Sequence, residues 1–400
     1  MRLKILEIDN ACTGCGACSN ICPKKCLNMK PNGEGFFYPV YDDKNCIECG
    51  LCEKTCHVLS TKEHHAANPD AFYLYHSNDE NLLKKSSSGG AFTLFANWVL
   101  QQGGIVYGSR YNGDTERLEV SSTDKSPLEK LRKSKYIESY TGSSFSEVRT
   151  HLQSGRRVLY CGTPCQVRGL KQFLETTKTK TDLLLCVDFA CHGVPSNFYF
   201  QQFKQLFESD NRKVAEVDFR HKDFSHPHMQ WHNMTLRLGF SDDSQKIFRR
   251  YSYFFYFYYE PFLDNLFLRK SCYQCNIASH SDADISLGDF WGITHHRSEL
   301  DDNKGMSFVC INNPAYQPLW EELRKSGFSE KLPFPAIEYQ YKDNCEKRSK
   351  QLLVREQFVR NVKTMGYGKA VLHHYGKKSM YKTIFLYKTK TFVKSIIGRK

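Results

Sequence analysis

The chain of 400 residues is long enough for two or three domains with a sizeable core. Its hydrophobic content of 40% fits a soluble globular protein, and its aromatic content of 14% is high. The formal charge of +13 is unevenly placed, because residues 357–400 hold eleven Lys or Arg and no Asp or Glu. Only +2 remains for residues 1–356, so the charge does not predict a nucleic-acid-binding protein.

Neither a secretion signal nor a membrane span is predicted. The N-terminus, MRLKILEID, lacks a long apolar segment. No run approaches the roughly 18 apolar residues that a spanning helix needs. Seventeen cysteines without a leader indicate a reducing compartment, where thiols bind metals rather than form disulfides. We therefore expect a cytoplasmic protein.

Two cysteine motifs near the N-terminus give the strongest signal. Each has the spacing C-x2-C-x2-C-x3-C that is typical of bacterial two-cluster ferredoxins. Three thiolates of a motif wrap one cluster, and the fourth ligates the neighbouring cluster. Zinc sites rarely show this rhythm twice. One 4Fe–4S cluster is thus predicted at Cys12, Cys15, Cys18 and Cys56, and the other at Cys46, Cys49, Cys52 and Cys22.

The rest of the chain predicts a mixed α/β (α+β) core. We expect the ferredoxin-like domain at residues 1–60, a linker at 61–70, the core at 71–335 and a helical, basic segment at 336–400. Turn residues and apolar runs place strands at residues 71–76, 105–111, 118–122, 157–160, 182–187, 214–219, 234–238, 246–248, 284–287 and 307–311. Helices are expected at residues 91–100, 144–153, 165–174, 251–268 and 314–323, with Ser88 as an N-cap and Pro164 near a first helical position.

A second group of cysteines lies at predicted strand ends and turns. Such positions are where an α/β sheet collects ligands. We therefore predict a third cluster at Cys165, Cys191, Cys272 and Cys275, with Cys161 as the alternative to Cys165. On spacing alone, scattered core thiols explain these residues equally well. The remaining cysteines, Cys26, Cys186, Cys310 and Cys345, are interpreted as structural.

Several short blocks resemble the coenzyme F420 hydrogenase/dehydrogenase beta-subunit family. They occur in family order, and the resemblance extends over about residues 1–335. The blocks are SSGGAFT at 87–93, KSKY at 133–136, GTPCQ at 162–166, DFACHG at 188–193, FRHK at 219–222 and DISLGDFWG at 284–292. The resemblance implies a flavoprotein core with FAD beside an iron–sulfur cluster, and it favours the third cluster. Relatives in this family include deazaflavin-oxidising subunits and proteins encoded among polysaccharide-synthesis genes.

The resemblance also suggests where FAD would bind. The first contacts are expected at Ser88, Gly89, Gly90 and Thr93, because backbone N–H groups at a helix start hold phosphate. Taken alone, this turn fits an ordinary capped helix better. Lys135 is expected to neutralise a phosphate or the reduced flavin, unless it is a solvated surface lysine. Further contacts are expected at Gly162, Thr163 and Gln166. No G-x-G-x-x-G motif follows a strand, so a Rossmann site has no support.

Catalytic residues are less well defined. The candidates are Lys135, His192 and Asp289. Together with Trp291, Asp289 is also expected to shape the face of the site on which a substrate lies, unless the two residues form a structural turn. A histidine such as His192 is more often packed or hydrogen-bonded within the protein than used as a proton donor. His57 stands where proline usually follows the second motif. We hypothesise that it shifts the potential of a nearby cluster through hydrogen bonding.

The aromatic run at 251–262 favours a core or interface helix, with a site for a flat substrate as the alternative. In the tail, one helical arc holds Phe385, Leu386, Thr389, Phe392, Val393, Ile396 and Ile397, with Lys390 and Lys394 largely opposite. This pattern suits an anionic membrane surface or an acidic partner, and a solvated tail or packed helix fits about as well.

Two functions are consistent with these features. The first is a flavin-dependent iron–sulfur oxidoreductase that acts on F420 or another small molecule. The second is a non-catalytic subunit that passes electrons to a partner protein, with a link to polysaccharide synthesis. Flavin converts between two-electron and one-electron transfer, which is why it accompanies clusters that normally take one electron.

Overall fold

The computed structural model describes residues 3–61, 71–250, 252–277, 281–338 and 348–397. Its centre is a nine-stranded mixed sheet with the order β14-β3-β13-β12-β8-β7-β4-β5-β6. The strands in that order are Gly327–Pro333, Ala71–Ser77, Ser307–Ile311, Ile285–Asp289, Leu184–Phe189, Val158–Cys161, Ile105–Asn112, Arg117–Ser122 and Ser139–Tyr140. The central strands β12, β8, β7 and β4 are parallel, whereas β3, β13 and β14 pair antiparallel. The predicted fold class is therefore confirmed.

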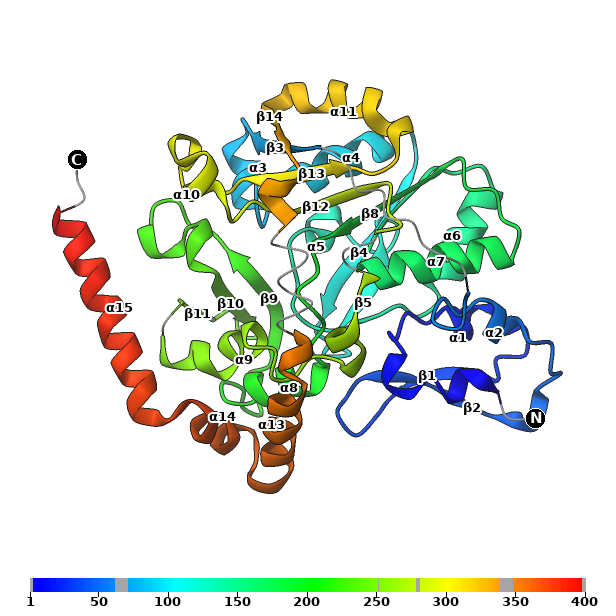
Figure 1. The fold of residues 1–400 in the computed structure, drawn as a ribbon, viewed down its shortest axis with the longest axis horizontal. Helices are drawn as coiled ribbons and strands as arrows, with labels where there is room; N and C mark the ends of the chain where they lie inside the picture. Colours follow the sequence, from blue (N-terminus) through cyan, green and yellow to red (C-terminus); the bar gives the residue numbers. More distant parts are fainter. Residues whose placement is uncertain (1–2, 62–70, 251, 278–280, 339–347, 398–400) are drawn as a thin grey trace.

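Helices cover both faces of this sheet (Figure 1). On one face, α4 (Ala91–Gln101) and α11 (Gln317–Leu323) pack on alternate residues such as Leu159 and Leu185. On the other face, α6 (Ser144–Gln153) and α7 (Pro164–Thr176) pack on Val158 and Tyr160. Successive strand residues point to opposite faces, so a strand that is buried on both sides reads as a continuous apolar run.

Smaller elements complete the fold. A two-stranded sheet, β1 (Leu27–Pro31) and β2 (Phe37–Tyr41), belongs to the N-terminal domain. A three-stranded antiparallel sheet joins β9 (Val214–His221), β10 (Thr235–Phe240) and β11 (Gln245–Phe248). The other helices are α1 (Ala17–Ile21), α2 (Leu51–Lys54), α3 (Glu80–Lys84), α5 (Leu128–Leu131), α8 (Asn197–Lys204), α9 (Tyr259–Leu263), α10 (Ile293–His296), α13 (Leu352–Met365), α14 (Tyr367–Tyr375) and α15 (Lys377–Ile397).

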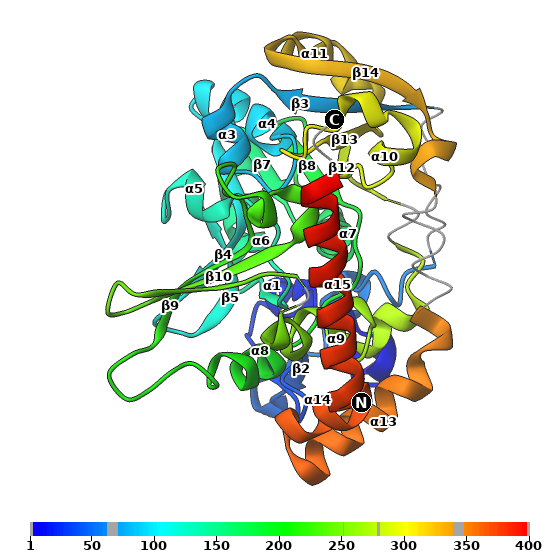
Figure 2. The same cartoon turned by 90° about the vertical axis from the view of Figure 1, so that its left-hand side faces the viewer.

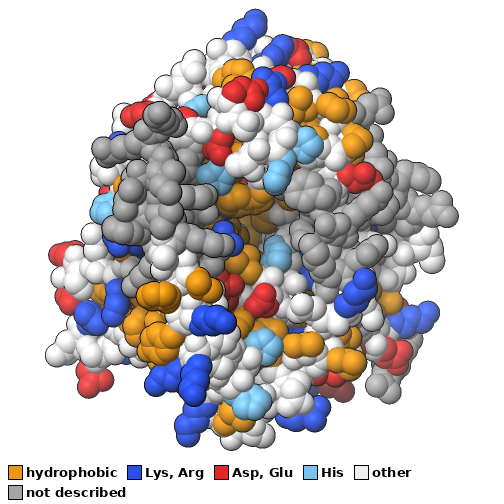
Figure 3. Space-filling model, turned by 60° about the vertical axis from the view of Figure 1, so that its left-hand side comes forward, with side chains coloured by type: hydrophobic (Ala, Val, Ile, Leu, Met, Phe, Trp, Pro, Cys, Tyr) orange, Lys and Arg blue, Asp and Glu red, His pale blue; other side chains and the backbone are white. Residues whose placement is uncertain are grey.

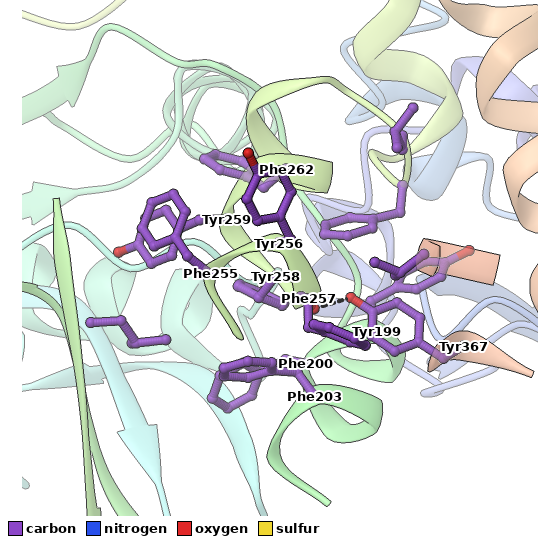
Figure 4. Packing of buried hydrophobic residues seen from close by; sticks show 14 of the residues in the cluster. Tyr199, Phe200, Phe203, Phe255, Tyr256, Phe257, Tyr258, Tyr259, Phe262 and Tyr367 are labelled. Carbon is purple, nitrogen blue, oxygen red and sulfur yellow. Dashed lines mark hydrogen bonds between the residues drawn. The ribbon is translucent and has the colours of Figure 1, made fainter. Parts of the chain in front are cut away.

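The aromatic run does not form the single helix that the sequence predicts over residues 251–268. It is divided into a 3-10 helix, Tyr253–Phe257, and the short helix α9. Pro261 explains the break, because proline has no N–H and clashes with the carbonyl one turn earlier. The run is nevertheless a core element, as expected: Phe255, Tyr258 and Phe262 are buried. Figure 4 shows these rings packed with Tyr199 and Phe200 of α8, and the Tyr367 hydroxyl donating to the Phe257 carbonyl.

The tail forms three successive helices, α13, α14 and α15. Figure 2 shows α15, in red, on the face of the molecule that is turned toward the viewer. The first part of α15 is anchored by Met380 and Ile384, which are buried in the aromatic core, and by Tyr381, which stacks on Tyr253 at 5.7 Å. No helix within the described residues has the combined length and apolar character that crossing a membrane requires.

Candidate functional site

Two short helices carry or flank the thiols of the N-terminal motifs. Helices α1 and α2 begin after Gly16 and Gly50, whose φ angles of 77° and 69° are in the left-handed region that favours glycine. The Cys18 thiol interacts electrostatically with those of Cys15, Cys12 and Cys56, and also with that of Cys52 in the second predicted set. The four residues predicted to hold one cluster therefore lie together.

The second predicted set surrounds a small cavity within the same domain. Cys22, Cys46, Cys49 and Cys52 all line it, together with residues of the range 3–51 only. Cys49 is exposed, so this site lies at the surface. Cys26 also borders the cavity, and its backbone N–H donates to Cys22 Sγ at 3.2 Å. This hydrogen bond holds the Cys22 thiol, a predicted cluster ligand.

The third set of thiols converges in the core. Cys165 lies in the first turn of α7, Cys191 follows β8, and Cys272 and Cys275 flank the end of the 3-10 helix Lys270–Gln274. The Cys191 thiol interacts with those of Cys272, Cys165 and Cys275. Cys161 instead interacts with Asp188 and Lys135, whereas Cys165 belongs to the group of thiols around Cys191.

Burial dominates the electrostatics of this thiol set. It raises the pKa of Cys165 to about 11 and that of Cys272 to about 12, and repulsion from Cys275 adds to both shifts. A metal must therefore displace protons from these thiols. Among the residues described, no three His, Cys, Asp or Glu side chains are arranged closely enough to hold a single ion. Sulfur-only sets suit iron–sulfur clusters, whose ligands bind separate iron atoms and stand further apart than those of one ion.

A cavity of about 580 Å³ lies beside these thiols. Its size is within the usual range for small-molecule sites, and it lies beyond the carboxyl ends of β7, β8 and β12, where such sheets bind ligands. Figure 3 shows a hollow in one face of the molecule with hydrophobic side chains inside it. The predicted site residues that line the cavity are Ser88, Gly90, Thr93, Lys135, Gly162, Thr163, Gln166, His192, Asp289, Trp291, Cys161, Cys165 and Cys191.

The start of α4 forms one wall of the cavity. Gly90, at φ 95°, is its N-cap, in place of the expected Ser88. The Ser88 hydroxyl is buried and has no hydrogen-bond partner within the described structure. Gly89 is not part of the lining: its N–H donates to Ser307 Oγ at 2.9 Å, and a Cβ there would lie 2.0 Å from the Tyr75 carbonyl oxygen. Gly89 therefore serves close packing, while an unsatisfied hydroxyl and a helix N-terminus fit a phosphate group.

Two basic residues of the β9 region hold this loop, and sequence reasoning assigned them no role. Lys222 Nζ donates to the Ser88 carbonyl at 3.0 Å, and Arg220 Nη2 donates to the Ser87 carbonyl at 3.4 Å. Burial holds the pKa of Lys222 well below its usual value, and neighbouring cations act in the same direction. The only sequence signal for them is their place in the FRHK block.

Asp289 and Trp291 belong to a packed polar and aromatic group. The Asp289 carboxylate accepts from Arg220 Nη1 and from Trp231 Nε1, both at 2.8 Å. Trp291 stacks on Trp231 with ring centroids 5.0 Å apart and planes 3° apart, and the Arg220 guanidinium lies 4.9 Å from the Trp291 ring. These contacts orient Asp289 as an ion-paired acceptor on the cavity wall.

The other two catalytic candidates differ in their protonation. Lys135 Nζ donates to the Lys133 carbonyl at 3.2 Å, and burial lowers its pKa to about 7, opposed by Asp218 and Cys161. Burial lowers the pKa of His192 to about 4. Its Nε2 lies 3.1 Å from the Phe262 carbonyl, an acceptor, so this nitrogen carries the proton. His192 is thus neutral and hydrogen-bonded, whereas Lys135 changes charge near neutral pH.

Thr163 and Gln166 have a second use in the fold. They form a capping box at the start of α7, in which Thr163 N–H donates to Gln166 Oε1 at 3.1 Å. Gln166 Nε2 also donates to the Ser139 carbonyl at 3.2 Å. Their side chains therefore shape the cavity wall while their polar atoms are largely engaged within the protein.

His57 links the two N-terminal motifs. Its Nε2 lies 2.9 Å from Thr13 Oγ1, beside Cys12, and the ring is buried. We expect His57→Pro to shift one cluster midpoint and leave the other unchanged, because hydrogen bonds near cluster sulfurs tune such potentials. A spectroscopic redox titration measures this, and two unchanged midpoints would refute the hypothesis.

Comparison with known proteins agrees with this arrangement. Residues 11–59 match the 4Fe-4S dicluster domain, and residues 155–335 match the C terminus of the coenzyme F420 hydrogenase/dehydrogenase beta subunit. One component of the F(420)H(2) dehydrogenase of Methanosarcina mazei is 25% identical over 234 residues, which is 55% of this chain and 65% of the relative. An iron-sulfur component of the CoB–CoM heterodisulfide reductase of Methanocaldococcus jannaschii is 39% identical over 61 residues, which is 12% of this chain and 9% of the relative.

Neither of these relatives is matched over two thirds of its length. A solved structure of the F420-reducing NiFe hydrogenase complex from Methanosarcina barkeri has a chain that aligns with a TM-score of 0.49 at 15% identity, covering 74% of this chain and 95% of that one.

The fold and the thiol sets define a protein that joins a ferredoxin-type dicluster domain to a mixed-sheet, cavity-bearing core. The match of residues 155–335 to the C terminus of the coenzyme F420 hydrogenase/dehydrogenase beta subunit confirms the resemblance that the sequence blocks indicate. The chain is thus an iron–sulfur protein related to F420 hydrogenase and dehydrogenase subunits.

Proposed function

We propose that this chain is a flavin-dependent iron–sulfur oxidoreductase that exchanges electrons between a small molecule and 4Fe–4S clusters. The observation that carries the proposal is the shared wall of the cavity. The start of α4, with its unsatisfied Ser88 hydroxyl, and the thiols of Cys165 and Cys191 border the same space of about 580 Å³. A flavin bound there would lie next to the core cluster.

The residues around the cavity suit FAD in two respects. Ser88, Gly90 and Thr93 would hold its phosphates at the start of α4, with Lys135 as a nearby cation. FAD supplies the conversion between hydride transfer and one-electron transfer when it is bound. Asp289 and Trp291 would bound the face on which the substrate lies, and F420 is the first substrate to test.

Metal and flavin analysis of protein purified without oxygen tests the proposal. We expect about twelve iron atoms, matching sulfide, and one FAD per chain, since three clusters of four iron atoms are proposed. About eight iron atoms and no flavin would contradict it, because only the N-terminal clusters would then be present.

The choice between Cys165 and Cys161 can be tested in the same way. Cys165→Ala is expected to lose about a third of the iron, whereas Cys161→Ala keeps it, because the Cys161 thiol faces Asp188 and Lys135. Equal iron losses in the two variants would favour a different ligand set. Both thiols border the cavity, so the two variants are matched in location.

A second candidate function is a subunit that passes electrons to a partner protein without its own substrate. The exposure of Cys49 favours it, because a surface cluster can exchange electrons with a docked protein. A partner involved in polysaccharide synthesis is the case to test. Screening of donors and acceptors distinguishes the two functions: oxidation of reduced F420, or oxidation or reduction of another small molecule, by the isolated chain supports the first.

The tail is proposed to bind an anionic membrane surface weakly. Phe385 and Leu386 are 68% and 49% exposed on α15, and residues 357–400 are basic without an acidic residue. The side chains predicted to complete this face from residue 390 onwards lie outside the described part of the chain. We expect salt-sensitive binding of the full chain to phosphatidylserine vesicles in a sedimentation assay. Equal binding by a chain that ends at Tyr375 would refute this proposal.

A further inference from the structure

The ferredoxin domain touches the core at helix α7. A Cβ placed on Gly169 would lie 2.8 Å from Cys15 Sγ and 3.0 Å from Cys15 Cβ. The Cys15 side chain therefore packs directly against the backbone of this helix. Cys165 is four residues earlier in α7, one turn away on the same face. One helix thus brings together a predicted ligand of the N-terminal domain and one of the core.

This contact involves Cys15 of one N-terminal site, whereas α7 meets the other site further along the helix, where Gln172 Nε2 donates to the Lys54 carbonyl near Cys52 at 3.3 Å. The thiols of Cys15 and Cys165 are close enough to interact electrostatically. The cavity between Cys22, Cys46, Cys49 and Cys52, in contrast, is lined by N-terminal residues only, and Cys49 is exposed. The two N-terminal sites therefore differ in position: one includes Cys15, which lies close to the core thiol of Cys165, and the other is open to solvent at Cys49.

The contact is fixed by polar bonds on both sides. Thr141 Oγ1 donates to the Cys15 carbonyl at 3.1 Å, and Asn20 Nδ2 donates to the Gly142 carbonyl at 2.7 Å. Arg269, just before the segment that carries Cys272, donates to the Cys12 carbonyl at 3.0 Å. The separation between the two thiol sets is therefore built into the folded chain.

We infer that electrons cross between the domains at the Cys15–Gly169 contact, so that the Cys12, Cys15, Cys18 and Cys56 site is the inner relay and the Cys22, Cys46, Cys49 and Cys52 site is the outer terminal. Gly169 is a positioning residue, since any side chain would push Cys15 away from α7. Electron tunnelling weakens exponentially with distance, so the closest pair of sites carries the transfer. Each transfer moves one electron, oxidising the donor site by one and reducing the acceptor site by one, with no covalent bond formed or broken.

This inference rests on the proposed core cluster, and magnetic spectroscopy tests the order of the sites separately from their presence. In the reduced full chain, neighbouring clusters broaden each other's electron paramagnetic resonance signals. Cys49→Ala should lose the outer site's iron, about four atoms, and keep the broadening between the inner and core sites. Cys15→Ala should lose the inner site and with it the broadening, because the outer and core sites are then too far apart.

Gly169→Ala tests the positioning role in the Cys49→Ala background. It should keep the iron content and reduce the broadening, because Cys15 must move away from α7. Gly368→Ala in α14 is the control, since its Cβ would meet only the Phe257 ring at 3.9 Å.

Broadening that is lost in Cys49→Ala or kept in Cys15→Ala would overturn the order, and an unchanged Gly169→Ala spectrum would overturn the role of Gly169. If the wild-type chain holds only about eight iron atoms, the core cluster is absent, and both the proposed function and this inference are wrong. The metal analysis alone detects that outcome.

Discussion

Replacing Arg269 with methionine is expected to lower the free energy of unfolding by about 3–5 kcal/mol. Arg269 and Glu138 form an ion pair in which both side chains are almost completely buried, with exposed fractions of 1% and 6%. Removing one partner leaves the other charge buried and unpaired, which costs far more than losing a surface pair. The Arg269 guanidinium also donates to the Phe37 carbonyl at 2.6 Å, so the ferredoxin domain loses a tether as well.

Denaturant unfolding without oxygen measures this effect, and two further variants isolate its cause. Adding Glu138→Gln to Arg269→Met should recover part of the stability, because the amide oxygen still accepts from the Phe37 N–H while no charge remains buried. The surface pair of Lys125 and Glu147, whose side chains are 58% and 28% exposed, is the matched control: Lys125→Met should change stability by at most about 1 kcal/mol. A similar small loss for Arg269→Met would mean that the buried pair contributes little.

The sequence predicts well those features that depend on neighbouring residues. The cluster motifs, the strands around residues 105 and 158, and the helix that begins at Pro164 all follow from local patterns. Helix α6 has the predicted bounds, Ser144–Gln153, because its apolar spacing matches the helical period. For Cys165, Cys191, Cys272 and Cys275, spacing alone leaves open whether they form a group, and only the family resemblance favours the convergence that the structure has.

Features that depend on distant contacts could not be predicted. No local pattern predicts strand β14, because it forms by pairing with β3, far earlier in the chain. Arg269 and Glu138 lie 131 residues apart, and nothing local marks either as a buried ion. Gly89 and Gly90 look equivalent in sequence, yet one packs against Tyr75 and the other caps α4. The role of each residue is decided by what the fold places beside it.

The last and largest expected effect concerns Lys135. Burial beside the cavity lowers its pKa to about 7, whereas an ordinary lysine titrates near 10.4. The neutral amine is the form that reacts with acetic anhydride, so labelling of Lys135 in the full chain should reach half of its maximum near pH 7. That midpoint lies about three pH units below the value for an ordinary lysine. Mass spectrometry of the labelled peptides measures the profile, with the exposed Lys130 of the same segment as the internal control.

The same shift makes stability depend on pH with a defined sign. Because the folded pKa lies below the unfolded value, the unfolded chain binds more protons between about pH 7 and pH 10, so this residue makes stability rise with pH there. Lys135→Met should remove this contribution to the pH dependence of the free energy of unfolding, which is at most about 1.4 kcal/mol per pH unit. The variant should exceed the wild type in stability by the largest amount below pH 7. A labelling profile that still rises steeply at pH 9, or equal slopes in the two proteins, would show that Lys135 is an ordinary charged lysine. Added FAD should move the labelling midpoint upward, because a phosphate near the amine favours its protonated form.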